Sequence, residues 1–203
     1  MEYVTQNQYD IYQDYVAQGG RLFINDACSF LCEVGYGNGY MWLVKGKGFA
    51  FNGTHAWKSV YRRWPLENQN WVGSNFNRFH YGTVPWNATV NASHPVGEHM
   101  QSHYGSSFTT SYRGHEENYI SNVSETTMIL QWKNALYDRP IAVYEHDYQN
   151  GTVLHTGIML SEVMYNDLRL MRLFISLLRY ALQGAVSEWT FPVEANIQAR
   201  ENP

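Results

Sequence analysis

The stretch Tyr15-Val-Ala-Gln-Gly-Gly-Arg-Leu-Phe-Ile24 decides the fold class of this 203-residue chain. Apolar residues from Tyr9 to Val16 recur at helical spacing, and the pair Gly19-Gly20 stands where a helix C-cap belongs. The run Arg21–Asn25 that follows is short and apolar, as is typical of a buried strand. A helix that ends in two glycines and leads directly into an apolar strand is an α/β connection, so the sequence predicts an α/β domain.

Further apolar segments extend this pattern toward the C-terminus. Strands are predicted for the runs 48–51, 127–132, 140–144 and 151–156. The Asn150-Gly151 pair between the last two is a signal of a tight hairpin. A buried helix is predicted from Asp167 to Leu182, with Asn166 as its N-cap and Gly184 as its stop. Within the glycine-rich residues 33–48, the stretch 35–39 is predicted to be a plain turn rather than a phosphate loop, and residues 61–81 a long surface loop.

Composition excludes several classes of protein. Apolar residues make up 44% of the chain, which is normal for one globular domain of this length. The net charge of −4 argues against a nucleic-acid binder, which needs a basic surface. No run of apolar residues is long enough to predict a membrane span. Charged residues are only 16% and aromatic residues also 16%, and a surface of rings, amides and hydroxyls suits sugars or protein neighbours.

Sequons point to a secreted or cell-surface protein, although a composition rich in Asn and Thr itself produces them. The candidate glycosylation sites are Asn52, Asn87, Asn91, Asn122 and Asn150. The start, Met1–Asp10, is polar and is not a signal peptide, so the chain is otherwise cytoplasmic or has lost its targeting segment. Two cysteines, Cys28 and Cys32, are too few for a disulfide scaffold or a cysteine-only zinc site.

The order of these segments resembles the class I glutamine-amidotransferase-like superfamily. The helix, glycine pair and strand of residues 15–24 are similar to that family, and so are Gly151–Gly157 and the closing helix. In its ThuA-like (trehalose-utilisation) branch, conspicuous histidines occur in segments similar to 46–55 and 72–80 and to the pair His94-Pro95. The resemblance covers residues 9–183. It implies a three-layer sandwich with a mainly parallel, flavodoxin-like sheet and an antiparallel addition near Asn150, as one domain over 1–184 followed by a tail over 185–203.

The chain departs from this family at its start. Such domains begin with one or two strand–helix units before the helix that ends in Gly-Gly, whereas this chain begins at that helix. Also, 21–25 and 48–51 compete for the same strand of the family pattern. A sheet without its first units has an open edge at Arg21–Asn25, and an open edge invites pairing with another chain. We therefore expect a homo-oligomer, or a partner chain that completes the sheet.

Cys28 follows a predicted strand, which is where a nucleophile elbow would lie. A catalytic thiol there needs a tight turn, usually with flanking glycines, and a histidine base, but its neighbours are Ala27 and Ser29. The late His-x-Glu pair of an amidotransferase is also missing, because neither His155 nor Glu145-His146 has that spacing. The sequence favours a buried structural thiol over a nucleophile or a Cys28–Cys32 disulfide, and no catalytic residue is predicted.

Histidines invite a metal-site hypothesis. His94, His99 and His103 form the densest group together with Glu98, and on a helix the last two histidines would share a face, as zinc-binding pairs do. However, Pro95 and Gly97 interrupt the helical pattern, and residues 102–105 resemble a loop. We expect solvated loop histidines and predict no metal and no cofactor.

The ThuA-like resemblance implies that His55 and His80 lie in a cleft, in a region dense in aromatic residues. The predicted binding residues are His55, Trp57, Trp71, His80, Tyr81 and His94. Planar rings beside amides are what sugar stacking needs, and the alternative is a satellite core beneath a long loop. We expect a non-catalytic recognition or assembly domain that contacts carbohydrate. The alternative is a ThuA-like enzyme that acts on a sugar derivative.

Overall fold

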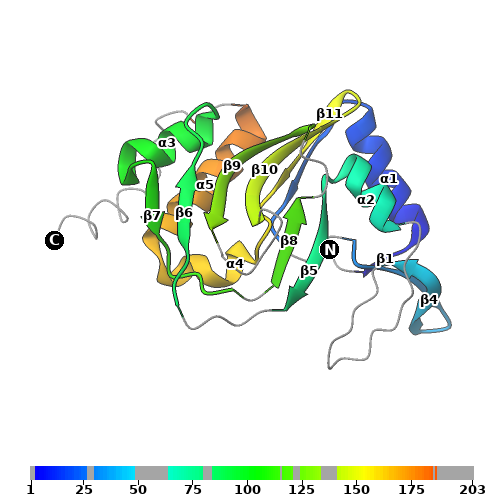
Figure 1. The fold of residues 1–203 in the computed structure, drawn as a ribbon. Helices are drawn as coiled ribbons and strands as arrows, with labels where there is room; N and C mark the ends of the chain where they lie inside the picture. Colours follow the sequence, from blue (N-terminus) through cyan, green and yellow to red (C-terminus); the bar gives the residue numbers. More distant parts are fainter. Residues whose placement is uncertain are drawn as a thin grey trace.

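The computed structural model describes residues 3–26, 30–48, 64–79, 84–114, 116–120, 124–133, 141–184 and 186, and its fold is mixed α/β (Figure 1). The elements of the first part are β1 (Tyr3–Val4), α1 (Gln6–Ala17), β2 (Arg21–Ile24), β3 (Cys32–Gly37), β4 (Tyr40–Gly48), α2 (Trp64–Trp71) and β5 (Ser74–Phe79). Those of the second part are β6 (Asn87–Val90), α3 (Pro95–Tyr104), β7 (Ser107–Thr109), β8 (Glu116–Ile120), β9 (Thr126–Lys133), β10 (Ile141–Tyr148), β11 (Gly151–His155), α4 (Leu160–Val163), η1 (Met164–Asn166) and α5 (Leu168–Gln183). Of the predicted tail over 185–203, only Val186 is described.

The largest sheet has the strand order β2-β11-β10-β9-β6-β7. Only β2 and β11 pair in parallel within it, and every other neighbouring pair is antiparallel. The prediction of a mainly parallel sheet is therefore wrong for the described residues. The predicted antiparallel addition near Asn150 is the β10–β11 hairpin. Antiparallel pairing continues through β9, β6 and β7, and these pairings join strands from separate parts of the chain that no local pattern specifies. The two smaller sheets are β1-β3-β4 and β5-β8.

Helices pack on both faces of this sheet, because successive residues of a strand point to opposite sides. Leu154 of β11 packs in one hydrophobic core with residues of α3 and α5, among them Leu173. Its neighbour Val153 packs in a second core with residues of α1 and α2, among them Trp71. Figure 1 shows α5 behind β6 and β9, with α1 and α2 at the β11 end of the sheet.

The predicted elements α1, β2 and α5 are confirmed, with caps that explain their limits. Thr5 forms a capping box with Gln8 at the start of α1. Asp167, one residue after the predicted N-cap, accepts the Arg169 N–H at 3.0 Å at the start of α5. Gly184 ends α5 in the left-handed conformation, as predicted.

Two regions predicted as loops are regular structure instead. Residues 61–81 contain α2 and β5. Trp71 at the end of α2 packs in the second core, and this burial stabilises the helix against the sheet. Residues 95–104 form α3, in which Pro95 stands at the first helical turn, where its missing N–H costs nothing. Gly97 lets this helix approach the chain closely, since a Cβ there would overlap the Asn91 carbonyl oxygen.

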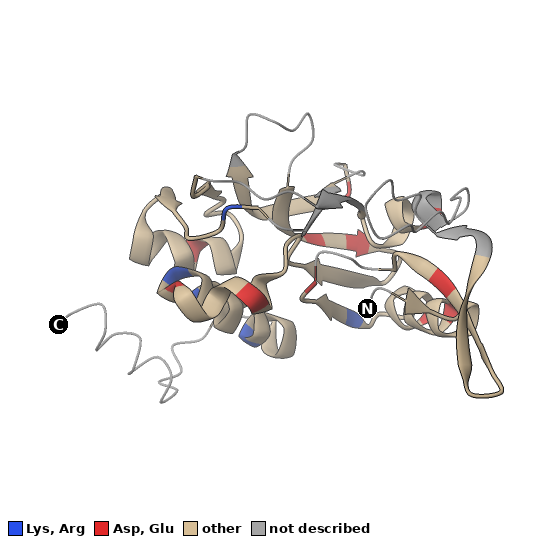
Figure 2. Ribbon diagram, turned by 90° about the horizontal axis from the view of Figure 1, so that it is seen from below, with Lys and Arg blue, Asp and Glu red and all other residues tan. Residues whose placement is uncertain are grey.

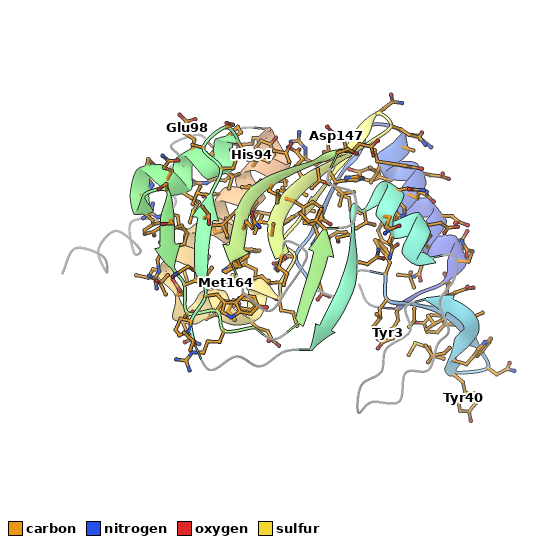
Figure 3. All side chains as sticks on the ribbon, viewed as in Figure 1. Tyr3, Tyr40, His94, Glu98, Asp147 and Met164 are labelled. Atoms are coloured by element: carbon orange, nitrogen blue, oxygen red, sulfur yellow. The ribbon has the colours of Figure 1, made fainter. Side chains whose placement is uncertain are left out.

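The turn predicted within residues 35–39 is confirmed, and it joins β3 and β4 in a hairpin. The register pairs Gly35 with Trp42 and Gly37 with Tyr40, so Asn38 and Gly39 make a two-residue turn with positive φ at both positions. The Trp42 ring lies across the glycines, because a Cβ at Gly35 would come within 2.5–2.7 Å of it. This hairpin projects from the rest of the chain, and Figure 3 shows Tyr40 at its tip pointing outward.

Candidate functional site

One cluster of hydrogen-bonding side chains joins three elements around the larger core. Its members are Glu145 on β10, His94 at the N-cap of α3 (labelled in Figure 3) and Tyr180 on α5. His94 Nδ1 accepts the Val96 N–H at 3.2 Å, so Nε2 carries the ring proton and donates to Glu145 Oε2 at 3.2 Å. The Tyr180 hydroxyl donates to the same oxygen at 2.8 Å. The His94 and Tyr180 rings meet edge to face, with centroids 4.6 Å apart.

Hydrogen bonds set the charge state of this cluster. Burial alone would raise the pKa of the Glu145 carboxyl, but the bonds from His94 and Tyr180 outweigh it and hold that pKa below its usual range. Burial and the bond to Glu145 raise the pKa of Tyr180 to about 12. Arg21 of β2 adds a cation, since its guanidinium lies 5.0 Å from the Tyr180 ring centroid and donates to the Tyr180 carbonyl at 3.0 Å.

This network holds β10, α3, α5 and β2 together. A general base must reach a substrate proton, yet both ring nitrogens of His94 have protein partners and its side chain is buried. Glu145 Oε2 already accepts two protein donors. His94 is thus a structural junction among the described residues, and its predicted contact with a ligand stays a prediction.

A second buried cluster lies where β2 and β11 end. His155 pairs with Ile24, its ring stacks on Tyr144 at 5.2 Å, and its Nδ1 accepts the Gly157 N–H at 2.8 Å. Burial lowers the pKa of His155 to about 3, against the opposing effect of the Asp26 carboxylate.

Tyr144 extends this second cluster toward β5. Its hydroxyl donates to the Val72 carbonyl at 2.8 Å and lies 2.6 Å from the Ser74 hydroxyl. Burial raises the pKa of the Tyr144 phenol above its usual range, so it is neutral. The cluster therefore ties β10 to the segment between α2 and β5 through uncharged groups.

The same cluster bears on the cysteine hypothesis. The strand that pairs with His155 leads, four residues after Ile24, to Cys28, which lies outside the described residues. A histidine with a pKa of about 3 is a weak base at neutral pH, so its burial does not favour thiol activation. Cys32 is buried, and the alternative of a Cys28–Cys32 disulfide stays a prediction because Cys28 lies outside the described residues.

Trp71, a predicted sugar-stacking residue, is fully buried. Its ring lies 5.0 Å from that of Phe30 and 5.4 Å from that of Tyr9. Its Nε1 donates to the Tyr9 hydroxyl at 2.8 Å, which in turn donates to Asn68 Oδ1 at 2.7 Å. With no ring face open, Trp71 fits the satellite core that was the alternative to a binding surface.

Several predicted site residues lie outside the described residues: His55, Trp57, His80, Tyr81, Asn52 and Asn122. Their roles stay predictions. Of the remaining sequons, Asn87 and Asn150 are exposed, whereas Asn91 is half-buried and its Nδ2 donates to the Met128 carbonyl at 2.9 Å.

Histidines of α3 share a face, as the metal hypothesis required, but they do not complete a site. The His99 and His103 rings lie 4.6 Å apart, while His94 turns to Glu145. Across the part of the chain that the structure describes, no group of three or more His, Cys, Asp or Glu could hold a metal ion. In that same part, no helix is long and apolar enough to cross a membrane.

Two surfaces remain open among the described residues. The hairpin of β3 and β4 exposes Tyr36, Tyr40, Met41 and Trp42, each between 51% and 76% exposed. The other surface is the edge of β2, which has β11 on one side only. Thr152 N–H donates to the Gly20 carbonyl and Thr156 N–H to the Ile24 carbonyl, so the odd-numbered residues of β2 turn their backbone groups away from β11.

Comparisons with known proteins show a similar fold in a solved structure but do not assign the chain to a family. No protein-family model matches the chain, and no curated protein matches it. Among solved structures, a β-galactosidase from Bacillus circulans sp. alkalophilus is similar, with a TM-score of 0.51 and 12% sequence identity. The alignment covers 91% of this chain but only 22% of that enzyme, so the likeness is to one part of a much longer protein and concerns the fold alone.

Proposed function

We propose that this chain is a non-catalytic recognition or assembly domain of a secreted or cell-surface protein. Its helices on both faces of the sheet fit a three-layer sandwich of the glutamine-amidotransferase-like kind, completed by another chain. The observation that carries this proposal is the β3–β4 hairpin with its four exposed large side chains. The register places Tyr40 and Trp42 on one face of the hairpin and Tyr36 and Met41 on the other, and exposed apolar patches are typical of interaction sites.

Two features of the hairpin favour recognition. Its tip carries no charged residue from Val34 to Val44, and Figure 2 shows that the nearest coloured band on it is acidic and lies away from the tip. The Trp42 ring is also held in place by its contact with Gly35, so less side-chain entropy is lost when a partner covers it. Trp and Tyr are the residues that most often dominate binding energy at interfaces.

The open edge of β2 supports assembly in a second way. Arg21, Phe23 and Asn25 turn their backbone donors and acceptors away from β11. An edge of this kind is a template for pairing with another chain.

The fold likeness agrees with a domain that works inside a larger protein. The similar β-galactosidase contains such a fold in about a fifth of its length. An enzyme with that name acts on a sugar, which accords with a carbohydrate context for this chain. The enzyme alternative, a ThuA-like activity on a sugar derivative, depends on His55 and His80, which lie outside the described residues.

Sedimentation of the whole chain tests the assembly proposal. We expect self-association at micromolar concentration, and a double variant Tyr40→Ser/Trp42→Ser that is shifted toward monomer. Tyr165→Ser is the matched control, because Tyr165 is 71% exposed on η1 and lies outside the hairpin. It should leave the association unchanged.

Amide exchange reports on the second surface in the same samples. In monomer, the amides of Leu22 and Ile24 should be protected and those of Arg21 and Phe23 should exchange fast; pairing at the edge should protect all four. A wild-type chain that stays monomeric at all concentrations, with the Arg21 and Phe23 amides already protected, would refute the proposal.

A further inference from the structure

One face of the sheet at β6, β7 and β9 carries mostly uncharged hydrogen-bonding residues, with Lys133 of β9 in register with Asn87 at its far end. Along these strands, Ala88 and Trp132 point into the larger core, and their neighbours point the other way. The register places Thr89 opposite Gln131, and Asn87 opposite Thr109, so these polar groups lie side by side. In Figure 1 this face is the one that β6 and β9 turn away from α5.

A cavity of about 460 Å³ opens at the end of this face, where β6 ends and β9 begins. Its lining includes Thr89, Asn91, Thr126, Thr127, Met128 and Gln131. Its volume falls within the range of roughly 300–1,000 Å³ that is usual for small-molecule sites. Beside it, Met128 packs against the cluster of Ile120, Ala142 and Tyr144, where β8 covers β10. The cavity therefore has one apolar side and one polar side.

The lining separates fixed groups from available groups. Asn91 is fixed, since its Nδ2 donates to the Met128 carbonyl and its Oδ1 accepts the Ser93 N–H at 3.0 Å. Thr126 is fixed by His146 Nδ1, 2.9 Å from its hydroxyl. Within the described residues, no hydrogen bond uses the side chains of Thr89 or Gln131, and both can donate and accept. Thr127 pairs with Glu145, which turns to α5, so the Thr127 side chain lies on the opposite face of the sheet.

The chemistry of this lining selects one class of ligand. Among the described residues that line it there is no Lys, Arg, Asp or Glu, so these residues offer no charge partner to an anion or a cation. An apolar ligand would leave the Thr and Gln groups buried without partners, which is unfavourable. A sugar ring has hydroxyls that both donate and accept, and C–H faces that can lie against Met128. We propose that this cavity binds a neutral saccharide.

This proposal deepens the carbohydrate part of the proposed function but uses different residues from the assembly surfaces. The test titrates the whole chain with neutral di- and trisaccharides of glucose, galactose and N-acetylglucosamine at millimolar concentration. A sialic acid-containing trisaccharide serves as the anionic comparison. Amide and methyl chemical shifts of the protein locate the binding. We expect shifts at Thr89, Met128 and Gln131.

Variants that keep size but remove hydrogen bonds sharpen the test. Thr89→Val and Gln131→Met should each weaken saccharide binding about fivefold, the effect of one lost neutral hydrogen bond. Ser107→Ala on the same face and Gln101→Ala on α3 are matched controls outside the cavity lining, and binding should be unchanged. Thermal unfolding of each variant checks that it is folded.

Three results would overturn the saccharide site. They are no binding of any neutral saccharide, binding that leaves the shifts of Thr89 and Gln131 unchanged, and a preference for the anionic sugar. The hairpin variant Tyr40→Ser/Trp42→Ser should bind the saccharide as the wild type does. The two proposals can therefore fail separately. Association is tested by the hairpin variant, and saccharide binding is tested by the cavity variants.

Discussion

Leu173→Ala on α5 should destabilise the protein strongly, because its side chain is fully buried between α5 and the main sheet. Replacing a buried Leu by Ala removes its transfer free energy and leaves a cavity, and such changes cost about 2–5 kcal/mol. At 203 residues, each kcal/mol lowers the midpoint of thermal unfolding by about 2–4 °C. A loss of about 3 kcal/mol therefore corresponds to a shift of about 6–12 °C.

Leu182→Ala is the matched control, since Leu182 lies on the same helix and is 77% exposed. Both substitutions make the same change in helix propensity, so the difference between them isolates burial. Urea unfolding measures the free energy of unfolding of each variant, and the control should stay within about 0.5 kcal/mol of the wild type. A difference below about 0.5 kcal/mol between the two variants would show that α5 does not organise the core, and the assignment of the faces would be wrong.

Three further predictions concern Gly97, His155 and Cys28. Gly97→Ala should destabilise α3 in urea unfolding, despite a gain in helix propensity of up to about 1 kcal/mol, because its Cβ would overlap the Asn91 carbonyl oxygen; a more stable variant would contradict the close approach. His155 is neutral when folded and gains a proton when unfolded, so stability should fall as the pH drops from about 6.5 toward about 3, by up to about 1.4 kcal/mol per pH unit. His155→Gln should flatten this dependence and His103→Gln, at an exposed position, should not; equal slopes in all three proteins would show that His155 is not the group responsible. Cys28 should resist a thiol-reactive probe in the folded protein at neutral pH, and stoichiometric labelling together with a hydrolase activity lost in Cys28→Ser would establish it as a nucleophile.

The sequence predicted the helix ends and turns that depend on a few neighbouring residues. The glycine pair at 19–20 ends α1 before β2, and Gly184 ends α5, because these positions need backbone conformations that glycine adopts at low cost. The Asn150-Gly151 signal predicted the turn between β10 and β11, where Gln149 has a φ of 52°. Each of these features depends on a few neighbouring residues, so one sequence is enough to find it.

The pairing of strands and the burial of side chains depend on residues far apart in the sequence. These features could not be predicted from the sequence alone. Nothing near Thr126–Lys133 says that β9 lies between β10 and β6, so the mainly antiparallel order could not be read from local patterns. Pro95 could either break a helix or begin one, and the His94 cap that decides it depends on contacts with β10 and α5. Trp71 has the composition of a sugar-stacking residue, and only the rings of Tyr9 and Phe30 around it reveal a core position.

Charged groups of the described residues take part in the buried network, whereas the two proposed binding places are uncharged. Glu145 gathers two donors on one oxygen, and Arg21 lies on the ring that supplies one of them, so these ions stabilise the junction between the sheet, α3 and α5. The hairpin from Val34 to Val44 and the described residues of the cavity lining include no Lys, Arg, Asp or Glu. Partners at these two places must therefore be bound by ring faces and neutral hydrogen bonds, whose strength changes little with salt, whereas exposed ion pairs are screened. Association and saccharide binding should consequently be almost unchanged between low and high salt, and a strong salt dependence of either would indicate that charged residues outside these surfaces make the contact.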